Sequence, residues 1–566
     1  MKTVLISINS KYVHTGLGIR YVAQYARDCG EEIELVEETI NTRMQSVLDN
    51  LINSAADVYG FSVHIWNRRY VFELAVMLKL LRPEAVIVLG GPEVSFAVAK
   101  AFAELPVVDY IVQGEGERSF AALLKYLRKG GAVPENIAYR SADGVMLNGG
   151  PTVVEDLAIL PFPYDDIEQI RDSRKIVYYE CTRGCPYRCA YCLSGISKNV
   201  RKRPLEYVLR DLDRFLEAKV ELVKFVDRTY NLDESYFLPI MKYLAAADTK
   251  TVFHFEIKAD TLSENALDFL AKVPAGRFQF EIGIQSTNAA TLRAINRWDD
   301  WQLLSGNIKR LLETKNIHIH VDLIAGLPFE GLSEFAESFN AVHDLNADKL
   351  QLGFLKVLPG TELAAQQHKH RLVFMPQPPY EILATKYLRY HDLRMLKMLE
   401  EVFDHTGNNS CFKNTMRALI SCSESNAFEF YCELTGWWHE HDGFMRQHNN
   451  KSVAKLLHGF ILEKYDCRKA EVLLEILRFD VFVHIKDWRP EWLNWRRQEI
   501  FEKMSRFWRD ETKVKKYVPD YEYGSWSTIN KKYPVECFKY HWLTKDYGDI
   551  YVLTDTVSGK VHLLDI

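Results

Sequence analysis

The chain has 566 residues, of which 47% are hydrophobic and 26% are charged, and its formal net charge is −5. This length predicts several domains, each with enough apolar residues for a buried core. The charge balance argues against a nucleic-acid partner. No apolar run approaches the roughly 20 residues of a membrane span, and no signal peptide is recognised. With ten cysteines that suit a reducing compartment, a cytoplasmic protein without a membrane partner is expected.

Residues 1 to 130 contain five short apolar runs that alternate with helical patterns. Strands that are apolar on both sides are typical of parallel sheets covered by helices on both faces. The pattern predicts an α/β, doubly wound, Rossmann-like domain. The expected strands are residues 3–8, 33–36, 58–63, 85–89 and 110–112.

Candidate binding residues follow these strands, because ligands of doubly wound sheets bind beyond the carboxyl ends of the strands. The candidates are Ser62, Gly90, Gly91, Gly114 and Glu115. Glycine pairs at such points are compatible with a dinucleotide, a flavin or a cobalamin. No Gly-x-Gly-x-x-Gly follows the first strand, which argues against the dinucleotide.

Three cysteines lie close together after a later strand-like run, with the spacing Cys185-x-x-x-Cys189-x-Tyr191-Cys192. Iron-sulfur clusters are normally held by four cysteines, so three predict a cubane with one iron open to another ligand. Cys181 brings the local count to four and leaves a zinc or four-cysteine site as the alternative. Structural zinc sites usually use two separated ligand pairs, and Cys181 also fits a small buried residue at a strand end.

From this loop onward, six apolar strand-like runs alternate with amphipathic segments. Such βα units predict a parallel sheet, and six of them an incomplete (β/α)6 barrel. The active site of a βα barrel is built at the carboxyl ends of its strands. The expected strands lie near residues 176–180, 222–226, 252–257, 278–284, 316–323 and 348–355.

Polar and glycine residues at these strands or their ends are further candidates for a ligand site. They are Asp227, Lys258, Glu281, Gln285, Ser286 and Gly326. Asp227 is also compatible with a helix N-cap. Glu281 lies within an apolar strand and therefore requires a partner.

The cysteine loop, with Tyr191 at its aromatic position, resembles that of the radical S-adenosylmethionine (SAM) enzymes. The resemblance implies a [4Fe–4S] cluster bound by Cys185, Cys189 and Cys192, with SAM on the open iron. One electron from the cluster then cleaves SAM to a 5′-deoxyadenosyl radical, which implies a donor such as flavodoxin or ferredoxin.

The same resemblance implies roles for the strand-end residues. Asp227 corresponds to the acidic position near the SAM amino group, and Lys258 to a position that often carries arginine toward the SAM carboxylate. A lysine cannot make the bidentate contact of an arginine. Glu281, Gln285 and Ser286 correspond to the ribose-binding segment and Gly326 to the adenine-binding turn.

The N-terminal loops resemble those of the cobalamin-binding domain that precedes many radical SAM domains, on Ser62 and the Gly90-Gly91 pair. Domains that supply a histidine to cobalt carry Asp-x-His-x-x-Gly after the first strand. Here Tyr12 and Leu17 occupy the Asp and Gly positions around His14. We therefore expect His14 to be a hydrogen-bonded structural residue, while cobalamin binding without a protein ligand stays possible.

The expected domains are a cobalamin-binding domain (1–140), a linker (141–172), a radical SAM core (173–375) and a C-terminal extension (376–566). The extension is predicted to be mainly helical and to end in a β-hairpin around residues 549–565. It resembles an uncharacterised extension of one subgroup of cobalamin-binding radical SAM proteins. A substrate lid is its expected role.

These features predict a cobalamin-dependent radical SAM enzyme, most plausibly a methyltransferase acting on an unactivated carbon or phosphorus of an unknown substrate. The alternatives are a radical rearrangement, ring formation or oxidation without methyl transfer, and a non-catalytic cobalamin or SAM sensor. A transfer RNA methylthiotransferase is disfavoured because its N-terminal domain needs three more cluster cysteines, and only Cys29 is present.

Overall fold

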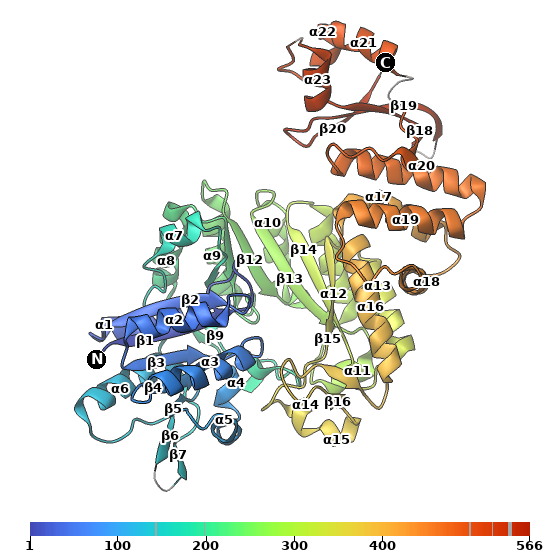
Figure 1. The fold of residues 1–566 in the computed structure, drawn as a ribbon. Helices are drawn as coiled ribbons and strands as arrows, with labels where there is room; N and C mark the ends of the chain where they lie inside the picture. Colours follow the sequence, from blue (N-terminus) through green and yellow to red (C-terminus); the bar gives the residue numbers. More distant parts are fainter. Residues whose placement is uncertain (142–143, 197–198, 497–499, 523, 542–545, 566) are drawn as a thin grey trace. The chain divides into compact units, whose positions relative to one another are not determined.

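The computed structural model describes residues 1–141, 144–196, 199–496, 500–522, 524–541 and 546–565. The chain divides into two compact units, Met1–Leu393 and Arg394–Ile566, and helix α16 (Tyr390–Thr406) spans the division. Figure 1 shows the elements of both units in chain order. None of the helices in the described part of the chain has the length and apolar character needed to cross a membrane.

The N-terminal domain is built on a seven-stranded sheet with the strand order β2-β1-β3-β4-β5-β6-β7. The first five strands are parallel, as predicted, and β6 and β7 are antiparallel. The order 2-1-3-4-5 is that of flavodoxin-like sheets, whose ligands bind where β1 and β3 meet. The strands are β1 (Thr3–Asn9), β2 (Ile33–Thr39), β3 (Val58–Ser62), β4 (Val86–Gly90), β5 (Tyr110–Val112), β6 (Ile137–Ser141) and β7 (Gly144–Asn148).

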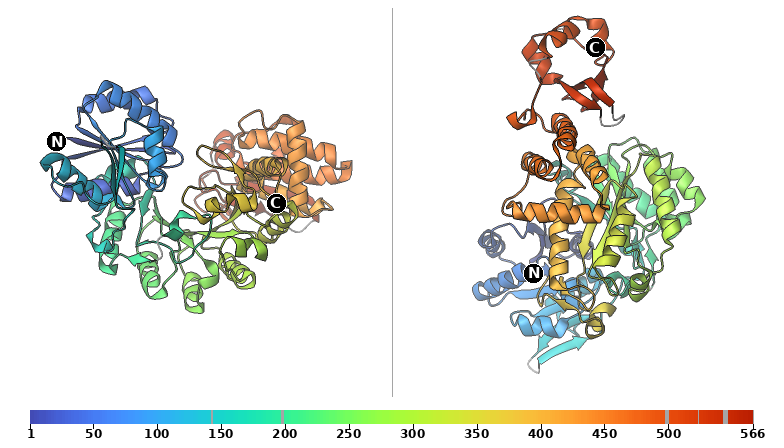
Figure 2. Two further views of the ribbon diagram at one scale, coloured as in Figure 1. Left: turned by 90° about the horizontal axis from the view of Figure 1, so that it is seen from below. Right: turned by 90° about the vertical axis from the view of Figure 1, so that its right-hand side faces the viewer.

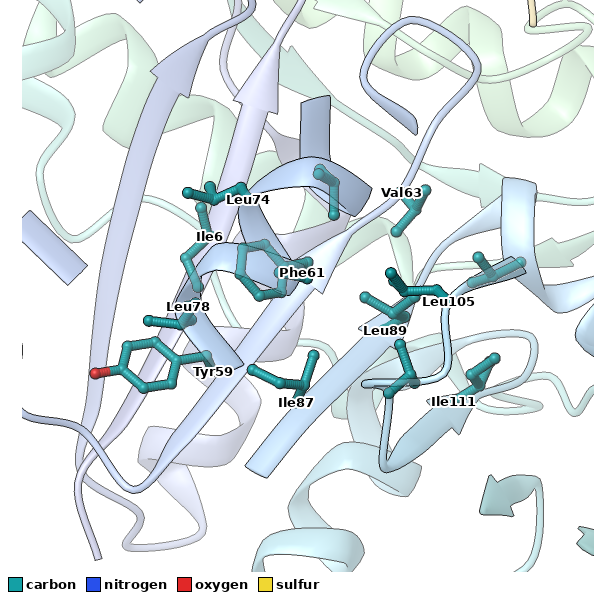
Figure 3. Packing of buried hydrophobic residues seen from close by; sticks show 14 of the residues in the cluster. Ile6, Tyr59, Phe61, Val63, Leu74, Leu78, Ile87, Leu89, Leu105 and Ile111 are labelled. Atoms are coloured by element: carbon teal, nitrogen blue, oxygen red, sulfur yellow. The ribbon is translucent and has the colours of Figure 1, made fainter. Parts of the chain in front are cut away.

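Helices cover this sheet because its central strands are apolar on both sides. All seven residues of β1 are buried. Figure 3 shows Ile6 and Phe61 packed against Leu74 and Leu78 of α3. Burying one such side chain contributes about 1.5–3 kcal/mol. The helices are α1 (Leu17–Asp28), α2 (Met44–Ser54), α3 (Arg68–Leu81), α4 (Pro92–Ser95), α5 (Val98–Glu104) and α6 (Gly116–Lys129).

The edge strands β6 and β7 were not predicted. Four of the five residues of β7 are exposed, so it lacks the apolar period that marks a strand in a sequence. The expected domain boundary at residue 140 lies inside this antiparallel pair. The N-terminal sheet instead extends to β7, and Thr152 forms a further bridge with Gly114.

The segment that follows contains η1 (Leu157–Ile159) and α7 (Ile167–Asp172) and connects the two α/β domains. Arg20 of α1 pairs with Asp166 at 2.6 Å. The hydroxyl of Tyr164 donates to the carbonyl of Tyr178 at 2.6 Å. The linker is therefore bonded to both domains.

The second domain confirms the predicted partial barrel of six parallel strands, in the order β15-β14-β13-β12-β11-β8. Figure 2 (left) shows helices along one side of these strands. The strands are β8 (Val177–Tyr179), β11 (Leu222–Phe225), β12 (Val252–Ile257), β13 (Phe278–Gln285), β14 (His318–Ala325) and β15 (Lys349–Phe354). The connecting helices are α8 (Leu205–Ala218), α9 (Glu234–Ala246), η3 (Ala259–Thr261), α10 (Glu264–Leu270), α11 (Ala289–Ala294), α12 (Trp301–Glu313) and α13 (Leu332–His343).

Side chains of this sheet alternate strictly between its two faces. Along β13, Phe278, Phe280 and Ile282 are buried, whereas Gln279 and Glu281 are half-buried. The apolar set packs under the helices, so the polar set occupies the inner face of the barrel. Shorter elements of this unit are β9 (Thr182–Arg183), η2 (Leu193–Ile196), β10 (Arg201–Lys202), α14 (Glu362–Ala365), α15 (Gln367–His370), β16 (Val373–Phe374) and β17 (Ile382–Ala384).

The C-terminal unit is mainly helical and ends in a three-stranded antiparallel sheet, which includes the predicted hairpin. Buried Arg478 of α20 pairs with Glu475 at 2.8 Å and with Glu536 of β18 at 3.2 Å, which ties this helix to the sheet. Trp437 and Trp438 are buried in α18. The elements are η4 (Ser410–Phe412), α17 (Lys413–Cys422), α18 (Ala427–Glu440), α19 (Asn450–Lys464), α20 (Cys467–His484), η5 (Glu491–Leu493), α21 (Phe501–Arg509), α22 (Glu511–Lys515), α23 (Trp526–Lys532), β18 (Val535–His541), β19 (Asp546–Thr554) and β20 (Val561–Leu564).

We predict that Gly91→Ala destabilises the N-terminal domain and that Gly90→Ala is tolerated. Gly91 has a φ of 102°, and a Cβ atom there would lie 2.6 Å from the carbonyl oxygen of Val63. A Cβ atom on Gly90 would meet Val112 at an ordinary 3.9 Å. Strain of about 2 kcal/mol or more is expected at Gly91. Hydrogen exchange of β3 and β4 measures it, and equal protection in both variants would contradict the argument.

Candidate active site

The loop after β8 brings Cys185, Cys189 and Cys192 together at the carboxyl end of the partial barrel. Cys185 is buried and the other two thiols are half-buried. The N–H of Ala190 donates to the carbonyl of Ile295 at 2.9 Å, and the N–H of Leu363 donates to the carbonyl of Ala190 at 2.8 Å. The loop is thus held by segments that follow β13 and β15.

The thiols of the loop lie close enough together to interact electrostatically. Burial raises the pKa of both Cys185 and Cys189, and the neighbouring loop cysteines raise it further. Arg228 and Arg297 act in the opposite direction on Cys185 and Cys189, respectively. Cations that coordinate thiols remove this repulsion. The donor set therefore fits a cluster in which each cysteine binds a different iron.

No group of three or more His, Cys, Asp and Glu side chains surrounds the position of a single metal ion in the described residues. Cys181, the fourth local cysteine, lies beneath the loop and is fully buried. Burial raises the pKa of its thiol well above the ordinary value. Its carbonyl accepts the N–H of Arg203 at 2.8 Å. This environment supports the interpretation of Cys181 as a structural residue.

Asp227 supports the strand end from which the cysteine loop begins. It is 1% exposed, and its carboxylate accepts the N–H of Cys181 at 3.1 Å and the hydroxyl of Thr182 at 2.6 Å. Burial raises its pKa to about 7, although these hydrogen bonds oppose the shift. Asp227 therefore braces the loop, and its contact with a ligand amino group stays a prediction.

Lys258 belongs to an ion-pair group that the sequence did not predict. Its ammonium pairs with Asp260 and, at 2.6 Å, with Asp299, and it lies 5.5 Å from the ring centre of Tyr187. Asp299 also pairs with Arg297. Lys258 is thus paired with carboxylates of the protein, and its predicted contact with the SAM carboxylate stays a prediction.

Arg297 is the main residue of this site that sequence reasoning missed. It donates to the carbonyl of Gly283 on β13. It also lies beside Tyr191: burial raises the pKa of that phenol, and Arg297 partly opposes the shift. An arginine between a short helix and two aspartates, in the run Arg297-Trp298-Asp299-Asp300, was the available signal.

Gln285 ends β13 in a β-bulge, with a φ of 70°. Its side-chain oxygen Oε1 is buried and has no hydrogen-bond partner among the described residues. Burying an amide oxygen without a partner costs about 1–3 kcal/mol. A hydroxyl group of a ligand would satisfy this atom, so the observation fits the predicted ribose contact.

Ser286 and Gly326 have structural partners. Ser286 is 2% exposed and donates to Glu330 at 2.5 Å. Gly326 has a φ of 94°, and a Cβ atom there would lie 2.8 Å from the Ile382 side chain. The close approach of Ile382 is sufficient to require glycine at this turn.

Glu281 lies deeper in the barrel than the strand ends. Its carboxylate is 3.0 Å from both Lys224 Nζ and His254 Nε2. The hydrogen bond from His254, together with Lys224, lowers its pKa to about 2 despite burial. The partner required for a charge in this strand is thus present, on the inner face and not at the strand end.

The loops after β3 and β4 of the N-terminal sheet lie side by side. Ser62 Oγ is 3.0 Å from His64 Nε2, and the His64 ring stacks on Trp66 at 4.3 Å. Burial lowers the pKa of His64 to about 4. The N–H of Val63 donates to the carbonyl of Gly90 at 2.8 Å. The predicted residues Ser62, Gly90 and Gly91 are therefore neighbours at the carboxyl ends of the central strands β3 and β4.

Gly114 and Glu115 both lie against other groups of the protein in the structure. A Cβ atom on Gly114 would lie 2.3 Å from the carbonyl oxygen of Thr152. Glu115 pairs with Arg201 at 2.6 Å and with Arg183 at 3.1 Å. Although burial raises it, the pKa of Glu115 is held below its ordinary value by these two guanidinium groups.

Arg183 connects the N-terminal sheet to the cysteine loop, two residues before Cys185. Besides Glu115 it pairs with Glu117 and Glu180, at 2.7 Å each, and it is 10% exposed. Glu115 and Glu117 begin α6 of the N-terminal domain. Glu115 thus forms an ion-pair link between the two domains, and its predicted contact with cobalamin stays a prediction.

His14 forms a second link, as a hydrogen-bonded residue. Its Nδ1 is 2.7 Å from the hydroxyl of Tyr178 on β8. Burial lowers its pKa, and Lys11 and Lys224 lower it further. This environment supports the structural interpretation made from the broken motif.

Comparisons with known proteins match three successive regions of the chain. Family models match at residues 3–124 (B12 binding domain), 179–342 (Radical SAM superfamily) and 368–553 (Protein of unknown function, DUF4080). The 2-(S-pantetheinyl)-carbapenam-3-carboxylate methyltransferase of Streptantibioticus cattleyicolor is 26% identical over 54% of this chain and 48% of its own length. An uncharacterized methyltransferase of Pyrococcus horikoshii is 21% identical over 71% of this chain and 93% of its own length.

Among solved structures, the cobalamin-dependent SAM radical enzyme OxsB, with aqua-cobalamin and SAM bound, superimposes with a TM-score of 0.63. It is 17% identical and covers 90% of this chain and 84% of its own, so it shows a shared fold. This chain spans about half the length of the carbapenam relative. The chain therefore carries a B12-binding domain, a radical SAM domain and a DUF4080 region in this order, which is the domain composition of cobalamin-binding radical SAM proteins.

Proposed function

We propose that the protein is a cobalamin-dependent radical SAM enzyme that methylates an unactivated carbon or phosphorus atom of an unidentified substrate. The observation that carries the proposal is the convergence of three thiols on the loop after β8 of a partial barrel. The similarity to a carbapenam-carboxylate methyltransferase supports methyl transfer. When bound, the cluster supplies the electron that cleaves SAM, and cobalamin supplies the methyl group.

The chain's own residues would hold and align these groups. Cys185, Cys189 and Cys192 would bind the cluster, and Gln285 Oε1 would accept a hydrogen bond from SAM. Asp227 holds the strand end beneath the loop. Arg183 and its carboxylates hold the loop against the N-terminal domain. Such alignment matters because misplacement by about 1 Å can cost 100-fold in rate.

We also propose an electron donor such as flavodoxin or ferredoxin, and a cytoplasmic location, where such reductants are present. A lid role for residues 376–566 stays a prediction.

The proposal predicts two products from anaerobic incubation of the reconstituted protein with reductant, hydroxocobalamin and methyl-labelled SAM. Mass spectrometry should detect 5′-deoxyadenosine and labelled methylcobalamin. Deoxyadenosine without labelled methylcobalamin would favour a rearrangement, ring formation or oxidation. Absence of both products would favour a non-catalytic sensor and contradict the proposal.

We predict that alanine at Cys185, Cys189 and Cys192 together abolishes cluster binding, whereas Cys181→Ala retains it. The three loop thiols interact with one another, while Cys181 is enclosed beneath them. Iron and sulfide analysis of anaerobically reconstituted protein should give about four of each per chain for the wild type and for Cys181→Ala. A retained [4Fe–4S] spectrum in the triple variant would refute the ligand assignment.

Gln285→Met should weaken SAM binding about tenfold, because one hydrogen bond of about 1.4 kcal/mol is lost. Gln279→Met is the matched control, since Gln279 lies on the same strand and face but far from the strand end. Equilibrium dialysis with labelled SAM measures both. Equal affinity in the two variants would exclude Gln285 as a ligand of SAM.

A further inference from the structure

A group of charged and titratable side chains crosses the inner face of the partial barrel, below the strand ends already described. We call it the inner belt. It comprises Lys224 of β11, His254 and Glu256 of β12, Glu281 of β13, and His320 and Asp322 of β14. Strand pairing aligns Glu256 with Glu281 and Glu281 with His320, so the belt is continuous across neighbouring strands.

One part of the inner belt is compensated within the protein. Glu281 has two close partners, Lys224 and His254, at 3.0 Å each. This arrangement keeps the Glu281 carboxylate ionised and leaves little of its charge for a ligand. The partners also explain why Glu281 is tolerated among the apolar residues of β13.

The charges of the other part, Glu256 and Asp322, are compensated less completely. Asp322 Oδ1 is buried and has no hydrogen-bond partner among the described residues. Burial, together with the neighbouring carboxylates of Glu281 and Glu256, raises the pKa of Asp322 to about 7, against smaller effects of Lys224 and Lys349. Glu256 is 27% exposed and forms a long ion pair with Arg228 at 4.0 Å; burial raises its pKa and Glu281 raises it as well, against the opposing effects of Arg228, Lys224 and His254.

Neither carboxylate has a cation within hydrogen-bonding distance among the described residues, and such groups are costly in a partly buried place unless a proton or a ligand neutralises them. Glu256 and Asp322 lie on strands separated by β13, so their strands are about 10 Å apart at a spacing of about 4.8 Å per strand. This separation suits an organic group that donates hydrogen bonds in two directions.

The inner belt also lies near residues of both predicted cofactor sites. Tyr178, on the inner face of β8, contacts His14 of the first loop of the B12-binding domain at 2.7 Å. Lys224 is close enough to His14 to lower its pKa. Gln285, at the end of β13, lies on the same face of this strand as Glu281. The belt is therefore adjacent to both the cobalamin-domain loop and the SAM end of the barrel.

We infer that Asp322 and Glu256 bind a cationic nitrogen group, such as a primary amine or a guanidine, of the molecule that the enzyme methylates. That this molecule is the methyl acceptor rests on the proposed function. Binding of the cation to the two carboxylates does not. Glu281 lines the site, but its charge is already balanced by Lys224 and His254.

Binding to the full-length reconstituted protein tests the inference with three four-carbon probes: putrescine, 1,4-butanediol and succinate. At equal ionic strength, putrescine alone should raise the apparent melting temperature. Asp322→Asn combined with Glu256→Gln should lose most of this shift. Asp268→Asn, which removes an exposed carboxylate of α10, is the matched control and should retain it.

A second measurement needs no probe. Asp322→Asn alone should raise the melting temperature of the ligand-free protein, because it removes an uncompensated buried charge. A variant that is destabilised or does not fold would show that Asp322 is already compensated, and this would overturn the inference.

Further outcomes separate the alternatives. Stabilisation by succinate alone would assign the belt to an anion bound by Lys224 and Lys349, and stabilisation by Mg²⁺ alone would assign it to a metal ion. Either result, or no stabilisation by any probe, would overturn the inference. Deoxyadenosine release is measured on the same sample. SAM cleavage without putrescine binding would overturn the cation site and leave the proposed function intact. Putrescine binding without SAM cleavage would support the cation site and contradict the proposed function.

Discussion

The strict alternation of side chains along the barrel strands is the constraint on which the site depends. One face of each strand is apolar and packs under helices, which stabilises the sheet by about 1.5–3 kcal/mol per large side chain. Only because Phe253, Phe280 and Val321 supply that stability is the opposite face free to carry His254, Glu281 and Asp322. A register shift of one residue would place every charge under the helices.

Buried charges are paired differently at the junction of the two α/β domains and in the inner belt. At the domain junction, Arg183 has three carboxylate partners and Glu115 has two guanidinium partners. Removing one partner of such a group leaves a buried charge and costs about 3–5 kcal/mol. This network therefore fixes the cysteine loop against the N-terminal sheet. In the inner belt, by contrast, Asp322 retains an oxygen atom without a partner among the described residues.

This difference is physically sensible for an enzyme. Groups that set the distance between two cofactor sites gain from complete pairing, because their geometry must not change during turnover. Groups that bind a substrate exchange their hydration water for contacts with the ligand. They therefore lack strong partners within the protein until the ligand binds. The braced Asp227 and the unpartnered Gln285 show the same division at the strand ends.

Much of the fold was predictable from local patterns. The six barrel strands and the five parallel strands of the N-terminal sheet are apolar runs of the right length, and short-range spacing alone marked Cys185, Cys189 and Cys192. Periodicity did not reveal β6 and β7, because exposed β7 has no buried face. The break around His14 at Tyr12 and Leu17 was also a local signal, and the structure supports the interpretation drawn from it.

Only the tertiary structure decided which polar residues are free and which are occupied. Glu115 followed a strand like any ligand-binding residue, but Arg183 and Arg201, more than 60 residues away, engage it. Lys258 and Glu281 are likewise engaged by Asp299 and Lys224 from other elements. The sequence by itself determined the order of the α/β elements, the spacing of the cluster loop and the strand ends, since these depend on local patterns. The partners of each charge depend on which strands become neighbours, and that is established only when the chain folds.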